Sequence, residues 1–154
     1  MRIRTKDRTM HIHEMLQVNE EISQSFQRLI PQLSDYSSLP SRESLMAMAA
    51  NGETFVYLAR HPDSEGRIVG SATLAVFQTP TGVHGWIEDV VVDMVVRRQG
   101  VGRALTEACL VKARELGLLD VHLTSRPSRI AANRLYQAMG FVRRDTNVYR
   151  FAFD

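Results

Sequence analysis

The sequence is poor in cysteine, tryptophan and proline, with one, one and five among 154 residues. Because Cys109 has no second cysteine to pair with, an intrachain disulfide is excluded and a reducing cytoplasm is the expected compartment. No apolar run is long enough to span a membrane, and the first residues lack the hydrophobic segment of a signal peptide. A formal net charge of +2 is too small to indicate a nucleic-acid-binding protein. The sequence therefore predicts a cytoplasmic protein with neither nucleic acid nor membrane as partner.

The length is that of one domain, large enough for a single sizeable core. Neither a repeat nor a low-complexity tract nor a break in composition marks a linker, so residues 1–154 are expected to form a single domain. The hydrophobic and charged fractions, 44% and 23%, are ordinary for a globular protein. Cys109 falls on the apolar stripe of an expected helix, which predicts a core residue and not a nucleophile.

Hydrophobic periodicity and turn residues predict an α/β fold, with a mixed sheet of about six or seven strands flanked by four helices. Asn19, Ser41 and Ser128 are expected to cap the first, second and last helices. The expected helices cover residues 20–33, 42–50, 101–116 and 129–139. The expected strands cover residues 10–16, 54–61, 68–77, 86–93, 121–125, 141–143 and 147–151. The loop 34–40 is a plausible wall or lid over a substrate.

One junction carries most of the functional signal. A β-branched strand ending in Val90, Val91 and Val92 is followed by a basic, glycine-containing turn and then by a helical pattern. The turn consists of Arg97, Arg98, Gln99, Gly100, Val101, Gly102 and Arg103. Unpaired N–H groups and the macrodipole make a helix start attractive to anions, and glycines let a ligand approach the main chain. The junction predicts a site for a pyrophosphate or sugar phosphate, unless the glycines only shape a turn and the arginines are solvated.

Two common phosphate-binding motifs do not match this turn. A P-loop would need a Gly-Lys-Ser/Thr ending, which is absent. A dinucleotide fingerprint would need a third glycine where Leu105 stands, followed in register by a strand with an acidic end. Both readings are therefore excluded.

Arg97-x-x-Gly100-x-Gly102 follows the valine-rich strand, and Asn133-x-x-Tyr136-x-x-x-Gly140-Phe141 lies further along the chain. The first resembles the acyl-CoA pyrophosphate motif of the GCN5-related N-acetyltransferases, or GNAT family, and the second resembles that family's second signature. The resemblance covers the second half of the chain, from about residue 85. It implies a single N-acetyltransferase domain that uses acetyl-CoA as acetyl donor and requires no metal. It departs at Val95-Val96, where many members carry an acidic residue or proline and an aromatic.

The resemblance also implies roles for individual residues. Main-chain groups of Val90, Val91 and Val92 would pair with the pantetheine arm, and N–H groups of residues 98–103 would bind the pyrophosphate. Asn133 matches the residue that contacts pantetheine or its bound water. Tyr136 matches the general acid that protonates the leaving thiolate, although a packing tyrosine beside the cofactor is the alternative.

For the general base, Glu88 and Asp89 are the acids inside the central strand. Successive side chains of a strand point to opposite faces unless a bulge intervenes, so at most one should enter a given side of a cleft. Glu88 is preferred because its context resembles polyamine and amino-sugar acetyltransferases. It could instead hold the substrate ammonium or be structural, and His84 is a weaker alternative base.

The acceptor remains open at this point. Acids at Glu88, Asp89 and Asp93 favour a small cationic amine. The rival function is a non-catalytic acyl-CoA sensor or protein-interaction module on the same fold. Homodimers are common in the family, though nothing in this sequence indicates one. His11 and His13 would share a strand face as a metal pair, but they lack a third ligand.

Overall fold

The computed structural model describes residues 2–5, 8–34 and 38–153. These divide into two compact units, Met1–Thr124 and Ser125–Asp154, which are described separately. The loop expected to wall or cover a substrate falls partly on residues 35–37, which lie outside the described residues. None of the described helices is long and apolar enough to cross a bilayer.

The first unit contains a mixed six-stranded sheet in the order β1-β2-β3-β4-β5-β6. Its strands are β1 (Arg2–Thr5), β2 (Arg8–Glu14), β3 (Thr54–Arg60), β4 (Ile68–Thr79), β5 (Gly82–Val92) and β6 (Val121–Leu123). All neighbours are antiparallel except β5 and β6, which are parallel. The α/β prediction with about six or seven strands is confirmed. The strand β1 was not foreseen in the sequence.

The described residues form four α-helices, as predicted. They are α1 (Glu20–Leu33), α2 (Arg42–Ala50), α3 (Val101–Glu115) and α4 (Ile130–Ala138), and two short 3-10 helices are η1 (Pro62–Ser64) and η2 (Met94–Val96). Asn19 caps α1 by accepting the Ile22 N–H at 2.9 Å, and Ser41 caps α2 at 3.1 Å. The cap predicted at Ser128 is wrong, because α4 begins after Arg129 without a side-chain cap.

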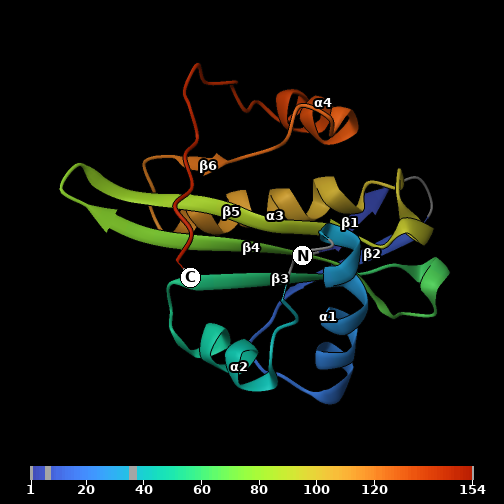
Figure 1. The fold of residues 1–154 in the computed structure, drawn as a ribbon. Coiled ribbons are helices and arrows are strands. Elements are labelled where there is room, and N and C mark those ends of the chain that lie inside the picture. The colour runs from blue at the N-terminus through green and yellow to red at the C-terminus, as the bar shows by residue number, and fades with distance from the viewer. Residues whose placement is uncertain (1, 6–7, 35–37, 154) are drawn as a thin grey trace. The chain divides into compact units, whose positions relative to one another are not determined.

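The helices of the first unit cover both faces of its sheet. Helices α1 and α2 lie on one side (Figure 1), where Leu29 and Leu45 pack against Leu58 of β3. Leu58 pairs with Ser71, so the adjacent Gly70 faces the opposite side. There, a Cβ on Gly70 would lie 3.0 Å from the Leu105 side chain of α3. The absence of a side chain at Gly70 thus lets α3 approach β4 closely.

Cys109 of α3 is completely buried, as predicted for a core residue. Burial raises the pKa of its thiol to about 12. A thiol in this environment stays protonated at neutral pH and is not a nucleophile.

Two predicted strands are wrong. Residues 141–143 and 147–151 belong to the second unit, whose described residues contain α4 but no strand. The connection Arg144-Asp145-Thr146 lacks the Asn-Gly or Asp-Gly pair that a tight hairpin turn favours. An isolated two-stranded hairpin is only marginally stable in water, so the local sequence pattern alone does not ensure that residues 141–143 and 147–151 pair.

Candidate functional site

A β-bulge reshapes β5 at the two candidate bases. Thr73 of β4 pairs with Glu88, while Ser71 pairs with Val91, so Asp89 and Val90 together oppose a single residue. Asp89 has φ 52°, a left-handed conformation that an aspartate tolerates better than most residues. The strict alternation expected for Glu88 and Asp89 is therefore interrupted at this point.

The bulge also fixes the face on which Glu88 lies. Thr73 pairs with Glu88 on one side and with Val56 on the other. Residues directly opposite one another across strands share a face, so Glu88 lies on the face of the sheet that α1 and α2 cover at Val56. Both Glu88 and Asp89 are exposed, which leaves their carboxylates accessible to a ligand.

The electrostatic surroundings of Glu88 favour its protonated form. Partial burial and the nearby charge of Asp89 raise the pKa of the Glu88 carboxyl above its usual range. A carboxylate with a raised pKa is a stronger proton acceptor once ionised, as a general base near neutral pH requires.

Beyond the bulge, β5 has an edge without a strand partner. The parallel strand β6 pairs only with Gly85–Ile87, whereas β5 continues to Val92. Among the residues that the structure describes, 88–92 therefore pair with β4 alone. An extended ligand can add to such an edge through main-chain hydrogen bonds. The edge includes Val90, Val91 and Val92, the residues predicted to meet pantetheine.

The predicted anion loop follows directly. After η2, Arg98 has φ 63° and Gly100 has φ 83°, and α3 begins at Val101. Gly100 is the N-cap of α3 and provides no side-chain hydrogen bond. The first main-chain N–H groups of α3 consequently lack a side-chain cap, and the positive end of its dipole is open to an anion.

Three arginines surround this helix start, and each is exposed. They are Arg97, Arg98 and Arg103. The Arg97 Nε donates to the Val92 main-chain oxygen at 3.3 Å, which ties the loop to the end of β5. Gln99 and Gly102 are half-buried and Val101 is buried, so Val101 anchors the turn in the core.

Asp93 has a different role from the one expected. It is only 5% exposed and forms an ion pair with Arg28 of α1. Its Oδ1 also accepts the Val95 N–H at 3.3 Å, while Arg28 donates to the Ile68 carbonyl at 2.6 Å. Asp93 is therefore not an exposed acid like Glu88 and Asp89, and it secures the loop to α1 and β4 instead of attracting a cationic acceptor.

Replacement of Asp93 by asparagine should lower the free energy of unfolding by about 1–3 kcal/mol, because Arg28 loses its charged partner. Urea unfolding followed by circular dichroism measures the change. Glu65→Gln, at an exposed position, is the control and should stay within about 0.5 kcal/mol of wild type. Equal stability of Asp93→Asn and wild type would contradict the anchoring role.

The second motif forms a compact arrangement within the second unit. The Tyr136 and Phe141 rings meet edge to face at 5.8 Å, and the Phe141 N–H donates to the Tyr136 carbonyl at 3.0 Å. Gly140, with φ 95°, ends the helix between them. The Asn133 amide nitrogen donates to the carbonyls of Arg126 and Arg129, each at 2.9 Å. Each motif is assembled within its own unit.

Sequence reasoning missed one cluster of ionisable side chains. The His84 Nδ1 lies 2.6 Å from the Asp120 Oδ1, and the His122 Nε2 lies 3.2 Å from the same oxygen. His84 was considered only as an alternative base. The signal that could have indicated the cluster was the Asp-x-His pattern at 120–122, at the start of β6.

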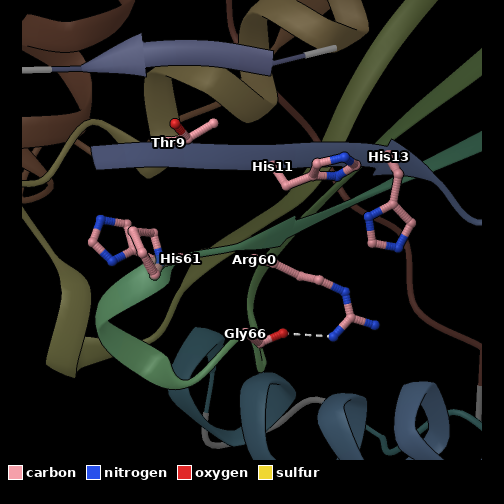
Figure 2. A pocket seen from close by; sticks show the side chains of 7 residues that line it. Thr9, His11, His13, Arg60, His61 and Gly66 are labelled. Carbon is pink, nitrogen blue, oxygen red and sulfur yellow. Dashed lines mark hydrogen bonds between the residues drawn. The ribbon is translucent and has the colours of Figure 1, made fainter. Parts of the chain in front are cut away.

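An open pocket of about 490 Å³ lies against β2 and β3 (Figure 2). It is lined by Thr9, His11, His13, Arg60, His61, Pro62 and Gly66. Arg60 donates to Glu21 at 2.6 and 2.8 Å and to the Gly66 carbonyl at 2.6 Å. Burial, followed by the charge of Arg60, lowers the pKa of His13. Among the described residues, His11 and His13 gain no third ligand, so this pocket does not support the metal pair considered from the sequence.

This chain is similar to a known protein family and to several solved acetyltransferase structures. The family model described as "Acetyltransferase (GNAT) family" matches residues 15–141. A solved acetyltransferase from Trypanosoma brucei is 27% identical, with a TM-score of 0.70, covering 93% of this chain and 99% of that one. An aminoglycoside acetyltransferase from an uncultured soil metagenomic sample is 21% identical, with a TM-score of 0.76 and coverages of 94% and 95%. Glucosamine-6-phosphate N-acetyltransferase from Arabidopsis thaliana is 18% identical, with a TM-score of 0.73 and coverages of 95% and 99%.

Proposed function

The chain belongs to the GNAT acetyltransferase family and is an acetyl-CoA-dependent N-acetyltransferase, and we propose that it acetylates a primary amine of a small cationic acceptor by direct attack. The whole chain, residues 1–154, would act as one N-acetyltransferase domain. The observation that carries the proposal is the edge of β5 at residues 88–92, which pairs with no further strand among the described residues and leads into the uncapped start of α3. An elongated ligand with a diphosphate at one end matches both features.

Acetyl-CoA would bind along this path. The amide-rich pantetheine arm would pair with Val90–Val92 as an added strand. Its pyrophosphate would accept hydrogen bonds from the main-chain N–H groups of residues 98–103, with Arg97, Arg98 and Arg103 supplying positive charge. Asn133 would contact the pantetheine or a water bound to it. These assignments direct the thioester toward the bulge at Asp89.

The reaction then needs a proton acceptor and a proton donor. Glu88, directly or through water, would take a proton from the acceptor's ammonium, and the neutral amine would attack the thioester carbonyl. The resulting tetrahedral intermediate would collapse as the C–S bond breaks. The Tyr136 hydroxyl would donate a proton to the departing thiolate, leaving coenzyme A and the acetylated amine. Asp89 would assist as a second carboxylate that attracts the cationic acceptor. This sequence of steps uses no metal.

The charges near the bulge favour a cationic acceptor. The bulge places Glu88 and Asp89 next to one another as exposed carboxylates, and a cationic amine complements them. Fold relatives are named as acetyltransferases of aminoglycosides and of glucosamine-6-phosphate, both with small amine acceptors. Another is named as a ribosomal-protein-alanine N-acetyltransferase, so a protein N-terminus is the competing acceptor.

The test is release of coenzyme A thiol from acetyl-CoA in the presence of a panel of amines. Polyamines, aminoglycosides, amino sugars, amino acids and N-terminal peptides would be compared at equal concentration. Amine-dependent release, greatest with the small polycationic amines, is the expected result. Acetyl-CoA binding without release for any amine would favour the non-catalytic sensor, and preference for peptides would overturn the acceptor class.

Glu88→Gln should remove the acidic limb of the pH profile of kcat/KM. In wild type, activity should rise with pH as the Glu88 carboxyl ionises, with a midpoint above the ordinary glutamate range because its pKa is raised. The kcat/KM of the variant at its optimum pH should be about tenfold lower than that of wild type. This loss is smaller than is usual for removal of a general base, because water can accept the proton instead. Steady-state kinetics with the best amine of the panel measures both effects.

Asp89→Asn is the matched comparison, since asparagine also tolerates a left-handed backbone. Removing the Asp89 charge takes away the second cause of the raised Glu88 pKa. The acidic limb should therefore persist in Asp89→Asn but move to lower pH. An unchanged profile in Glu88→Gln would assign the base to another group.

A further inference from the structure

The cluster of His84, Asp120 and His122 lies at the end of the β5–β6 pair that is remote from the anion loop. At a rise of ~3.3 Å per residue, about 13 Å of strand separates His84 from Glu88, and about 30 Å separates His84 from Asp93. One ligand atom from each of the three residues can be chosen so that all lie within 4.8 Å of one another. The cluster therefore lies about 13 Å along β5 from Glu88 and shares no residue with the groups proposed to carry out acetyl transfer.

The main chain holds these residues in place. The Leu119 N–H donates to the Val83 carbonyl and the Gly85 N–H donates to the Asp120 carbonyl, both at 3.0 Å. These bonds extend the parallel pairing, in which Trp86 is opposite His122. The main chain of Asp120 is consequently held beside β5 independently of the contacts of its side chain.

Neighbouring aromatic rings restrict both imidazoles. The Trp86 ring is stacked on His122 with centroids 5.5 Å apart and an angle of 18°. The Phe77 ring lies 5.7 Å from His84. The His84 Nε2 is 3.4 Å from the Thr81 hydroxyl oxygen, which leaves Nδ1 directed at Asp120. Fixed rings of this kind lose little entropy when a ligand binds.

We propose that His84 Nδ1, His122 Nε2 and an Asp120 carboxylate oxygen bind a divalent cation of the zinc type. Two imidazoles and one carboxylate form a borderline donor set that suits Zn²⁺ better than Mg²⁺ or Ca²⁺. Bonds of 2.0–2.1 Å around a tetrahedral ion place ligand atoms ~3.3 Å apart, so small side-chain rotations would complete the site. Water would occupy the fourth position, because Asp120 is exposed and the cluster is open to solvent.

Hydrogen bonding at Thr81 supports ligation through Nδ1 of His84. A metal-binding imidazole usually donates its other N–H to an outer partner, which fixes the tautomer. Here Nε2–H would donate to the Thr81 oxygen, and ligation of the ion would replace the direct contact between His84 Nδ1 and Asp120.

The bound ion would act as a clamp. Only three residue pairs join β5 and β6, from Gly85↔Val121 to Ile87↔Leu123. An ion held by His84 of β5 and by Asp120 and His122 of the β6 segment would cross-link the two strands where they meet. It would stabilise the pair without taking part in acetyl transfer, so this inference stands whether or not the proposed acceptor is correct.

The experiment uses the untagged full chain after treatment with a chelator. Zn²⁺ is titrated in competition with a chromophoric chelator, and Co²⁺ is added separately to record the visible bands of a low-symmetry N/O site. We expect one Zn²⁺ per chain, a rise in Tm on binding, and at least a tenfold weaker Kd in His84→Ala and His122→Ala. Asp120→Asn, which keeps the side-chain volume, should also weaken binding and guards against misfolding of the alanine variants.

His11→Ala/His13→Ala is the matched control, because it removes the same number of imidazoles from β2. Zinc affinity, stoichiometry and the Co²⁺ spectrum should be the same in this variant as in wild type. Absence of stoichiometric zinc binding to wild type would overturn the proposal. Equal zinc affinity in His122→Ala and wild type, or loss of binding in the β2 variant, would do the same.

Discussion

Gly100→Val is expected to raise the Kd for acetyl-CoA at least ~100-fold. Gly100 has φ 83°, and a β-branched residue in this region is strained by ~1–3 kcal/mol. The side chain would also stand at the N-cap of α3, where the pyrophosphate is proposed to approach main-chain N–H groups. Backbone strain would distort the loop, and the valine side chain would block the approach of the pyrophosphate. Each tenfold rise in Kd corresponds to a loss of ~1.4 kcal/mol of binding free energy. Isothermal titration calorimetry measures the change.

Gly117→Val provides the control for backbone strain. Gly117 has φ 68°, follows the other end of α3, and has no heavy atom within 4 Å of an added Cβ. The two variants should therefore lose comparable stability, while only Gly100→Val loses acetyl-CoA. A wild-type Kd in Gly100→Val would refute the assignment of the loop. Equal losses of affinity in both variants would show that the effect is one of folding.

Tyr136→Phe should lower kcat by ~10 to 1,000-fold while the Kd for acetyl-CoA changes little. The substitution removes the phenolic hydroxyl, the group proposed to protonate the thiolate, but keeps the ring that packs on Phe141. Stopped-flow and steady-state thiol release with the best amine measure these quantities.

Tyr149→Phe makes the same chemical change at an 88% exposed tyrosine of the same unit. It should have wild-type kcat and pH dependence. If Tyr136→Phe retained full turnover, Tyr136 would be a packing residue and the acid would have to be sought elsewhere. A raised Kd with unchanged kcat would instead assign Tyr136 to cofactor binding alone.

Local signals in the sequence were sufficient for most elements. The caps at Asn19 and Ser41 and the start of α3 at Val101 were predicted correctly. These features depend on residues within a few positions of one another, so propensity and capping chemistry specify them. The closing strands at 141–143 and 147–151 failed because a strand exists only through a partner, which local pattern does not supply.

Long-range contacts decided the details of the site. The sequence allowed a bulge at Glu88 and Asp89 but could not place it, because a bulge is a mismatch of register between β4 and β5. Asp93 could be recognised as an acid near the loop, yet its partner Arg28 is 65 residues away in sequence. That Asp93 is buried against Arg28, and is not exposed like Glu88, followed only from the packing of α1 on the sheet.

By itself the sequence determined the family, and it predicted an anion-binding helix start and the candidate acid and bases, since these consist of short motifs with their own chemistry. The tertiary structure alone decided which face Glu88 occupies, where the edge of β5 stays unpaired, and that His84 meets Asp120 and His122. Each of these depends on strand register and on contacts between distant segments. Register is set by the burial of the whole sheet between its helices, which is a property of the folded chain and not of any single segment.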